Sequence, residues 1–174
     1  RNEQGVPTIT AENTDDLFFA QGYAHAQDRF WEMDFRRHVT AGRVAELFGE
    51  SQVGTDMFLR TLGWHEIAEE EVAALDETTL SYYESYAAGV NAYLAENKGG
   101  DLALEYSVPG LTSPVYEPEP WTPADSVAWP KAMAAMLSVL FTTSARTAAV
   151  SWFRCPMAST RCAATTARAL PAVS

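Results

Sequence analysis

The chain has 174 residues, enough for one domain with a sizeable apolar core. Its hydrophobic content of 47% indicates a globular protein. Its net charge of −11 argues against nucleic acids and anionic membranes as partners, because both attract clustered Lys and Arg. The sequence has neither an apolar run long enough to span a membrane nor a basic start followed by an apolar stretch, so we expect no membrane partner and no signal peptide.

Composition changes abruptly along the chain. All 23 acidic residues lie in residues 1–125, whereas residues 126–174 contain no Asp or Glu and also lack Gly, Asn, Gln, Ile, His and Tyr. This C-terminal stretch is either a disordered tail or a segment not selected to fold with the rest, such as a shifted reading frame, and we favour the second. Cys155 and Cys162 both lie in it, and their C-x6-C spacing matches no common zinc pattern.

The first predicted element is a short strand. Gly5 and Pro7 favour a turn, and the alternation that follows predicts a strand around Val6–Thr10. Asn13 or Thr14 is a suitable N-cap for a helix, because acidic residues in the next turn are favoured by the helix dipole. We therefore expect one strand followed by one long helix.

That long helix has a continuous apolar stripe. Its members recur at steps of four and three residues: Phe19, Tyr23, Ala26, Phe30 and Met33. This period is typical of one helix face packed against a core. Monomers seldom expose large apolar patches, so the stripe requires a partner surface, and we do not expect residues 1–134 to be stable alone.

Further helices follow. Periodicity predicts them over 43–48, over 55–75, and from Asp76 or Thr78 to a stop at 98–100. Gly63 is a weak point in the second of these, because glycine disfavours a helix interior.

The region after residue 108 is rich in proline, which predicts a loop over 109–123 rather than a helix. Thr122 can cap a last helix that has Pro123 at its first position. Pro130 predicts a kink in that helix.

Polar residues on the long helix suggest a metal site. His25, Asp28 and Glu32 share one helix face, and His65, Glu66 and Glu69 lie together on another predicted helix. Carboxylate-bridged di-metal bundles use Glu-x-x-His pairs, which both stretches lack, and neither stretch is H-E-x-x-H. The pattern favours solvated or hydrogen-bonded helix flanks. A stand-alone metal-binding bundle that uses His25, Asp28, Glu32, His65 and Glu69 stays as an alternative of another class.

No complete active site is predicted in residues 1–125. A Ser–His–Asp triad requires a serine on a tight turn such as G-x-S-x-G, and no serine has that setting. Ser81 and Ser85 are expected mid-helix, and Ser107 and Ser113 in the loop region. His38 and His65 are interpreted as surface or packing residues rather than bases.

Several motifs follow one another in a characteristic order. They are RNEQGVPTITA, AQGYAHAQDRFWEMDFRR, AGRVAELFG, a D-x-x-x-R stretch from Asp56 to Arg60, YAAGVNAYL and PWTPADSVAW. In this order and spacing they resemble the penicillin acylases (penicillin amidases), a family of N-terminal-nucleophile hydrolases. The resemblance covers residues 1 to about 134, and HAQDR together with the GVNA segment is its most specific part.

The resemblance implies a fold and a partner. The family has the four-layer α+β fold of N-terminal-nucleophile hydrolases, to which this chain would contribute mostly helices and one short N-terminal strand. Family precursors are secreted and cut themselves into an α and a β subunit, and the N-terminal Ser of β is the nucleophile. The chain then corresponds to an α subunit with no catalytic residue of its own, partnered by β in a periplasmic or extracellular heterodimer. HAQDR would be an architectural helix near the subunit interface.

The implied reaction is hydrolysis of a small-molecule amide, namely the side-chain amide of penicillins or of related N-acyl compounds. Acyl-homoserine-lactone and lipopeptide acylases of the same family are alternatives. The sequence assigns no substrate-binding residue, and the fragment alone is expected to be inactive.

The sequence departs from the family pattern near Ala135. The family helix continues there to a calcium-ligating Glu, expected near position 144, where this chain has Ser144. The same stretch lines the acyl pocket in the family. We therefore expect calcium in the intact family enzyme but no calcium ligand from this chain. Residues 135–174 are expected to be a non-family tail, disordered or adventitiously helical.

Overall fold

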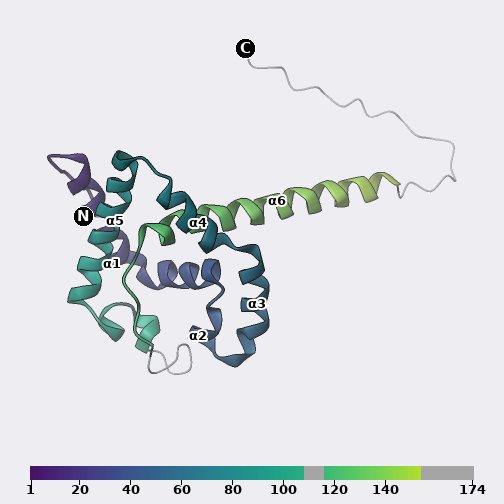
Figure 1. Cartoon of the computed structure of the whole chain (residues 1–174), viewed down its shortest axis with the longest axis horizontal. Helices are drawn as coiled ribbons and strands as arrows, with labels where there is room; N and C mark the ends of the chain where they lie inside the picture. The colour runs from purple at the N-terminus through teal and green to yellow at the C-terminus, as the bar shows by residue number, and fades with distance from the viewer. Residues whose placement is uncertain (108–115, 154–174) are drawn as a thin grey trace, which may run out of the picture. The chain divides into compact units, whose positions relative to one another are not determined.

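A computed structural model describes residues 1–107 and 116–153, with the backbone alone over 139–153. The chain divides into two compact units, Arg1–Ala135 and Met136–Ser174. Within the described residues every regular element is helical, as Figure 1 shows. None of the described helices is long and apolar enough to cross a membrane.

The longest element of the first unit is α1 (Thr14–Ala41). Of the two predicted caps, Asn13 is the one used, since its side chain accepts from the backbone N–H of Asp16 at 2.8 Å. The helix ends at Gly42, whose φ of 62° lies in the left-handed region. Non-helical angles at Arg29 bend α1 near its middle.

Helix α5 (Glu77–Glu96) packs directly along α1. Two glycines allow this close approach. A Cβ on Gly22 would lie 2.1 Å from the Tyr86 carbonyl oxygen, and one on Gly89 would lie 1.9 Å from that of Phe19. The main core forms around this pair, with Ala26 and Phe30 of the predicted stripe buried together with Ala87, Val90 and Tyr93 of α5. Tyr23 and Met33 are partly buried against this core, whereas Phe19, the first residue of the predicted stripe, is 41% exposed.

The remaining elements are shorter, except for the last. In chain order they are α2 (Val44–Phe48), η1 (Glu50–Gln52), α3 (Val53–Leu62), α4 (Trp64–Ala73), η2 (Gly99–Asp101), η3 (Leu104–Ser107) and α6 (Pro123–Phe153). The predicted 55–75 helix is divided into α3 and α4 at Gly63, where φ is 63°. Asp76 rather than Thr78 caps α5, because its carboxylate accepts from Thr79 N–H at 3.0 Å.

The predicted start of α6 is confirmed. Thr122 N–H donates to the Asp125 carboxylate at 2.8 Å, and Pro123 is the first helical residue. The helix continues through Pro130 to Phe153.

The prediction of a strand near Val6–Thr10 is wrong for this chain, because these residues belong to no regular element and no strand occurs among the residues described. A β-strand needs a neighbouring strand to satisfy its backbone groups, and the described chain offers none.

The predicted tail, 135–174, is described only in part. Its residues up to Phe153 lie within α6, while residues 154–174, including Cys155 and Cys162, lie outside the described residues. The domain boundary at residue 134 and the non-family origin of the tail stay predictions.

Candidate functional site

A groove of about 710 Å³ lies in the first unit, lined by residues of α1, α5, the segment before α6 and the first turns of α6. Its walls are largely aromatic: Phe18, Tyr82, Tyr83, Tyr86, Trp121 and Trp129. The rings of Phe18 and Tyr82 stack at 5.0 Å between centroids and connect α1 to α5 along one wall. Such a cleft suits an apolar or aromatic group, whether from a small molecule or from another chain.

The polar side of the groove comes from α1, on the face predicted for HAQDR. His25 Nδ1 lies 3.0 Å from the Tyr86 hydroxyl oxygen, and the two rings meet edge to face. Burial raises the pKa of Tyr86 to about 12, so its hydroxyl stays protonated at neutral pH. This pair fixes the position of α1 against α5.

The charges beside the groove are already paired. Arg1 donates to the Asp28 carboxylate at 2.6 Å, and Glu32 accepts from both Arg29 and Arg36. The Arg36 guanidinium also lies 4.7 Å from the centroid of the Trp129 ring. Glu32 is thus neutralised by two arginines, which leaves it a poor ligand for a metal ion.

A second polar cluster lies deeper, around Asp34. This fully buried carboxylate accepts from Arg37 and from the hydroxyls of Tyr106 at 2.6 Å and Tyr116 at 2.7 Å. Burial, together with the nearby Asp34 charge, raises the pKa of both tyrosines above the usual range. Arg37 in turn donates to the Glu119 carbonyl at 2.9 Å. The cluster therefore joins α1, η3 and the segment before α6.

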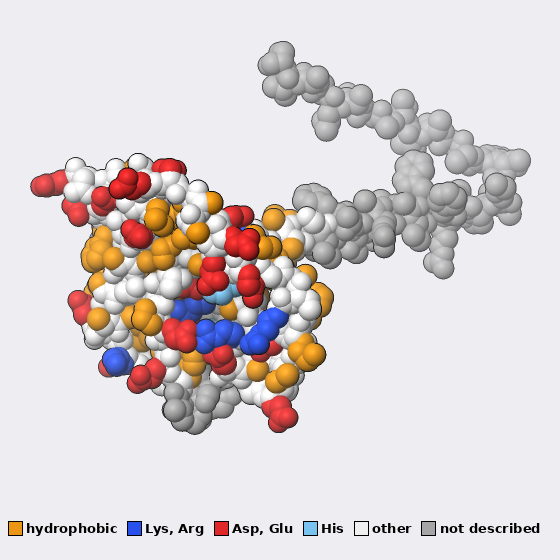
Figure 2. Space-filling model, viewed as in Figure 1, with side chains coloured by type: hydrophobic (Ala, Val, Ile, Leu, Met, Phe, Trp, Pro, Cys, Tyr) orange, Lys and Arg blue, Asp and Glu red, His pale blue; other side chains and the backbone are white. Residues whose placement is uncertain are grey.

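Neighbouring charges continue this pattern of pairing. Arg43 binds both Glu46 and Glu119, each through two nitrogens. Figure 2 shows basic side chains gathered in a band across one face, with acidic side chains directly beside them. Asp56 of α3 accepts from the backbone N–H groups of Val44 at 2.7 Å and Ala45 at 2.8 Å, so it caps α2 from another helix.

The metal-bundle alternative fails within the described residues, which bring together no group of three or more His, Cys, Asp or Glu side chains able to hold a metal. His25, Asp28 and Glu32 do line one groove, as their spacing predicts. His65 lies on α4, 3.9 Å from Glu69, and does not line that groove. The two predicted groups therefore do not converge on one ion.

The described serines named in the sequence do not form a dyad. Ser81 and Ser107 each donate to a backbone carbonyl one turn earlier, and Ser126 accepts from the Trp121 indole. His38 is buried, with Nδ1 2.7 Å from the Asp34 carbonyl and its ring against Tyr116. Ser113 lies outside the described residues, and only the backbone of Ser144 is described.

The Asp34 cluster was missed by sequence reasoning. In DFRRH, Asp34 and Arg37 are three residues apart and adjoin a strongly apolar helix face. An acid and an arginine in this position are a sequence signal for a buried ion pair. The tyrosines that complete the cluster lie 72 and 82 residues further along the chain, so no local pattern identifies them.

The comparison with family models decides the family. The model described as penicillin amidase matches residues 1–165. The chain belongs to the penicillin amidase family. The early motifs, from RNEQG to PWTPADS, are therefore correctly interpreted.

Curated relatives include both penicillin and homoserine-lactone enzymes. The chain is 37% identical over 128 residues to a penicillin acylase 2 proenzyme of Pseudomonas sp., covering 74% of this chain and 16% of the relative. It is 38% identical over 129 residues to the acyl-homoserine lactone acylase QuiP of Pseudomonas fluorescens, covering 72% and 15%. It is 34% identical over 128 residues to the penicillin G acylase of Escherichia coli, covering 72% and 14%.

A solved structure resembles the chain over its whole length. It is a thermostable penicillin G acylase from Alcaligenes faecalis, with a TM-score of 0.68 and 26% sequence identity, covering 100% of this chain and 96% of the matched chain. The helical part of an N-terminal-nucleophile hydrolase is therefore present. The alignments with curated relatives span about one sixth of their length or less.

Proposed function

We propose that the chain is the α-subunit portion of a two-chain amidohydrolase. The proposal rests on how differently the chain covers a solved structure and the curated relatives. The chain accounts for nearly all of one chain of a penicillin G acylase structure, yet for only 14% to 16% of curated relatives such as the Pseudomonas proenzyme. A family enzyme thus has a separate chain of this size, and the remainder of the proenzyme supplies at least one more.

Catalysis is assigned to that second chain, β. Amide hydrolysis by acyl transfer needs an activated hydroxyl, a base and an oxyanion hole. Among the described residues, His25, His38, Ser81, Ser107 and Ser126 make structural hydrogen bonds, and none of these serines is bonded to a histidine. The proposed nucleophile is the N-terminal Ser of β, and this chain supplies the helical frame against which β folds.

The proposed substrate is the side-chain amide of a penicillin or a related N-acyl compound. Acyl-homoserine lactones are the alternative from the same family, because relatives of both kinds match with nearly equal identity, 37% and 38%. Acyl pockets discriminate by about 1–3 kcal/mol per methylene, so a few side chains decide between these substrates. A periplasmic or extracellular location is part of the same proposal.

Calcium is proposed for the intact family enzyme but not for a site in this chain. Calcium prefers carboxylate and carbonyl oxygens. Residues 126–174 contain no Asp or Glu, and Ser144 stands where the family glutamate is expected. The described residues also bring together no group of three or more His, Cys, Asp or Glu side chains able to hold a metal ion. This donor set does not fit the ion.

The test is expression of the encoding locus, with the DNA beyond codon 134 read in each frame. We expect one frame to encode a glutamate near position 144 and a second chain that begins with Ser after self-cleavage. The two-chain product should release the acyl group from penicillin G or from acyl-homoserine lactones, and replacing that Ser with Ala should abolish release. A locus with no such second chain in any frame would refute the proposal.

A further inference from the structure

Helix α3 carries large apolar side chains on its outer surface. Met57 is 67% exposed and Phe58 63%, and Val53 and Leu62 are also exposed. The side of α3 that is buried contains Asp56 and Leu59. At about 100° per residue, the pair Asp56 and Leu59 lies nearly opposite the pair Met57 and Phe58. Helix α3 thus buries a carboxylate beside Leu59 while it exposes two large apolar side chains.

Polar contacts fix this orientation of α3. The Asp56 carboxylate caps α2 through Val44 and Ala45 N–H, as described above. Arg60 Nε donates to the Gly42 carbonyl at 2.9 Å, and a Cβ on Gly42 would lie 2.6 Å from Arg60 Cγ. Rotating α3 to bury Met57 and Phe58 would break these bonds and leave α2 uncapped. The exposure is therefore imposed by the fold of this chain.

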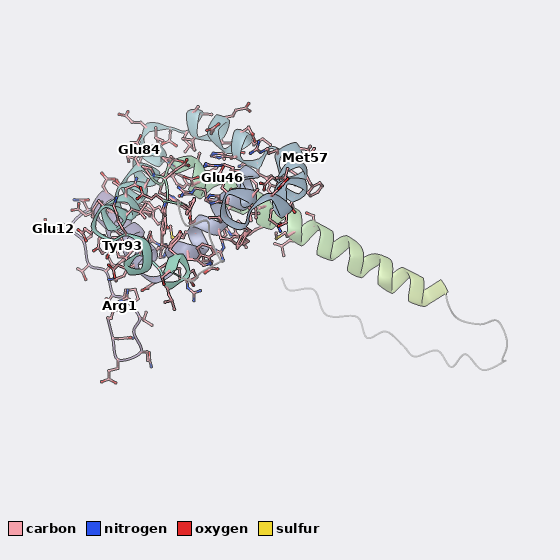
Figure 3. The ribbon with its side chains drawn as sticks, turned by 90° about the horizontal axis from the view of Figure 1, so that it is seen from below. Arg1, Glu12, Glu46, Met57, Glu84 and Tyr93 are labelled. Atoms are coloured by element: carbon pink, nitrogen blue, oxygen red, sulfur yellow. The ribbon has the colours of Figure 1, made fainter. Side chains whose placement is uncertain are left out.

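The charged residues of α3 are Asp56 and Arg60. Asp56 is buried, and Arg60, although exposed, donates its Nε to the Gly42 carbonyl. Helix α3 therefore exposes no acidic side chain, although the chain carries 23 acidic residues. We define the α3 face as Val53, Met57, Phe58 and Leu62. Figure 3 shows Met57 at the edge of the helical body, far from the core residue Tyr93. A solvated helix of a strongly acidic chain would present charges here, so an uncharged apolar face indicates a protein partner.

We propose that the α3 face packs against an apolar surface of the β chain. This rests on the proposed function, because β is the occupant. More than four-fifths of the length of the curated relatives lies outside this chain, and the bulk of the enzyme is therefore available to cover the face. The D-x-x-x-R stretch, Asp56 to Arg60, then has a defined task. It turns α3 so that its apolar side faces β.

The test uses the two-chain enzyme expressed from its precursor with Phe58→Glu and, separately, Met57→Glu. Both side chains are mostly exposed in the isolated chain, so its helical content should not change. We expect each variant to weaken retention of β at least tenfold, and we expect hydrogen exchange of the α3 backbone to slow when β is bound. The matched control is Leu104→Glu, because Leu104 is the most exposed large apolar residue of the described chain, at 74%, and lies outside α3.

Four outcomes would overturn the proposal. If the variants retain β normally and hydrogen exchange of the α3 backbone does not slow when β is bound, β covers other surfaces. If the enzyme is still active in that case, the proposed function stands. Equal weakening by Leu104→Glu would assign the effect to added acid rather than to the α3 face. Concentration-dependent dimerisation of the chain alone, lost in Phe58→Glu, would assign the face to a second copy. If no β chain exists at all, the proposed function fails with it.

Discussion

Asp34 is the residue with the most demanding environment in the described chain. It is fully buried and accepts from one guanidinium and two tyrosine hydroxyls. A buried charge is tolerated only when it is paired and hydrogen-bonded, and Asp34 meets both conditions. Exposed pairs such as Arg1–Asp28 are different, because water screens them and they contribute little.

Asp34→Ala should therefore be severely destabilising. It leaves the buried Arg37 without the carboxylate to which it is hydrogen-bonded, and removal of one partner from a buried pair costs about 3–5 kcal/mol of unfolding free energy. The control Asp28→Ala, in an exposed pair, should cost at most about 1 kcal/mol. Urea denaturation followed by helical circular dichroism measures both. Equal midpoints for the two variants would show that the Asp34 cluster is not a stabilising centre.

Tyr86 provides a test by pH. Burial raises the pKa of its hydroxyl from 10.0 to about 12. Since the folded-state pKa is the higher one, the unfolded chain loses its proton first as pH rises, and the contribution of Tyr86 to stability is lost between pH 10 and 12. The tyrosinate absorbance of the folded chain should include groups that titrate well above the ordinary tyrosine pKa. Tyr86→Phe should remove one of these groups. Titration of Tyr86 near its ordinary pKa would contradict the burial of its hydroxyl.

At the scale of elements, the close crossing of α1 and α5 organises the first unit. Gly22 and Gly89 bring the helix backbones together because neither has a Cβ. The apolar stripe from Tyr23 to Met33 then packs along the line of contact. The sequence predicts this stripe from its period, but it does not predict which helix covers it.

Gly22→Ala should separate the two helices. Its Cβ would stand 2.1 Å from a backbone oxygen, so the helices must shift, at a cost of roughly 1–3 kcal/mol or more. Gly54→Ala in α3 is the matched control, because nothing lies within 4 Å of its Cβ. There the alanine should stabilise by about 1 kcal/mol through helix propensity. Thermal melts of both variants decide the point, and a stabilising Gly22→Ala would show that the crossing is looser than described.

Helix boundaries were the most predictable feature, because caps and breakers act locally. Asn13, Asp76 and Thr122 were all among the predicted caps, and Gly63 was recognised as a weak point. The strand at Val6–Thr10 was wrongly predicted, because its existence depends on a partner strand that local alternation cannot reveal. The α1 side of the groove is predictable from the spacing of HAQDR, but its aromatic walls are completed by residues of α5 and of the region around the start of α6, which lie far along the chain.

At the scale of the whole molecule, residues 135–174 are predicted to be sensitive to protease. Residues 135–174 lack apolar periodicity, so we expect brief proteolysis to trim the chain back to about residue 134. Mass spectrometry of the resistant fragment measures this. Protection of Trp152 or Phe153, at the end of α6, would show instead that the tail folds with the remainder of the protein.

We propose that this chain supplies a helical frame to a two-chain enzyme, with the catalytic residues on the second chain. Its paired charges and capped helices stabilise that frame, and the α3 face is the surface proposed to contact the second chain. The most direct measurement is release of acid from penicillin G and from an acyl-homoserine lactone by purified residues 1–174, alone and after assembly with the second chain. We expect no acid to be released by the chain alone, and we expect release by the assembled two-chain enzyme. Hydrolysis by the chain alone, retained after removal of any copurifying protein, would contradict it.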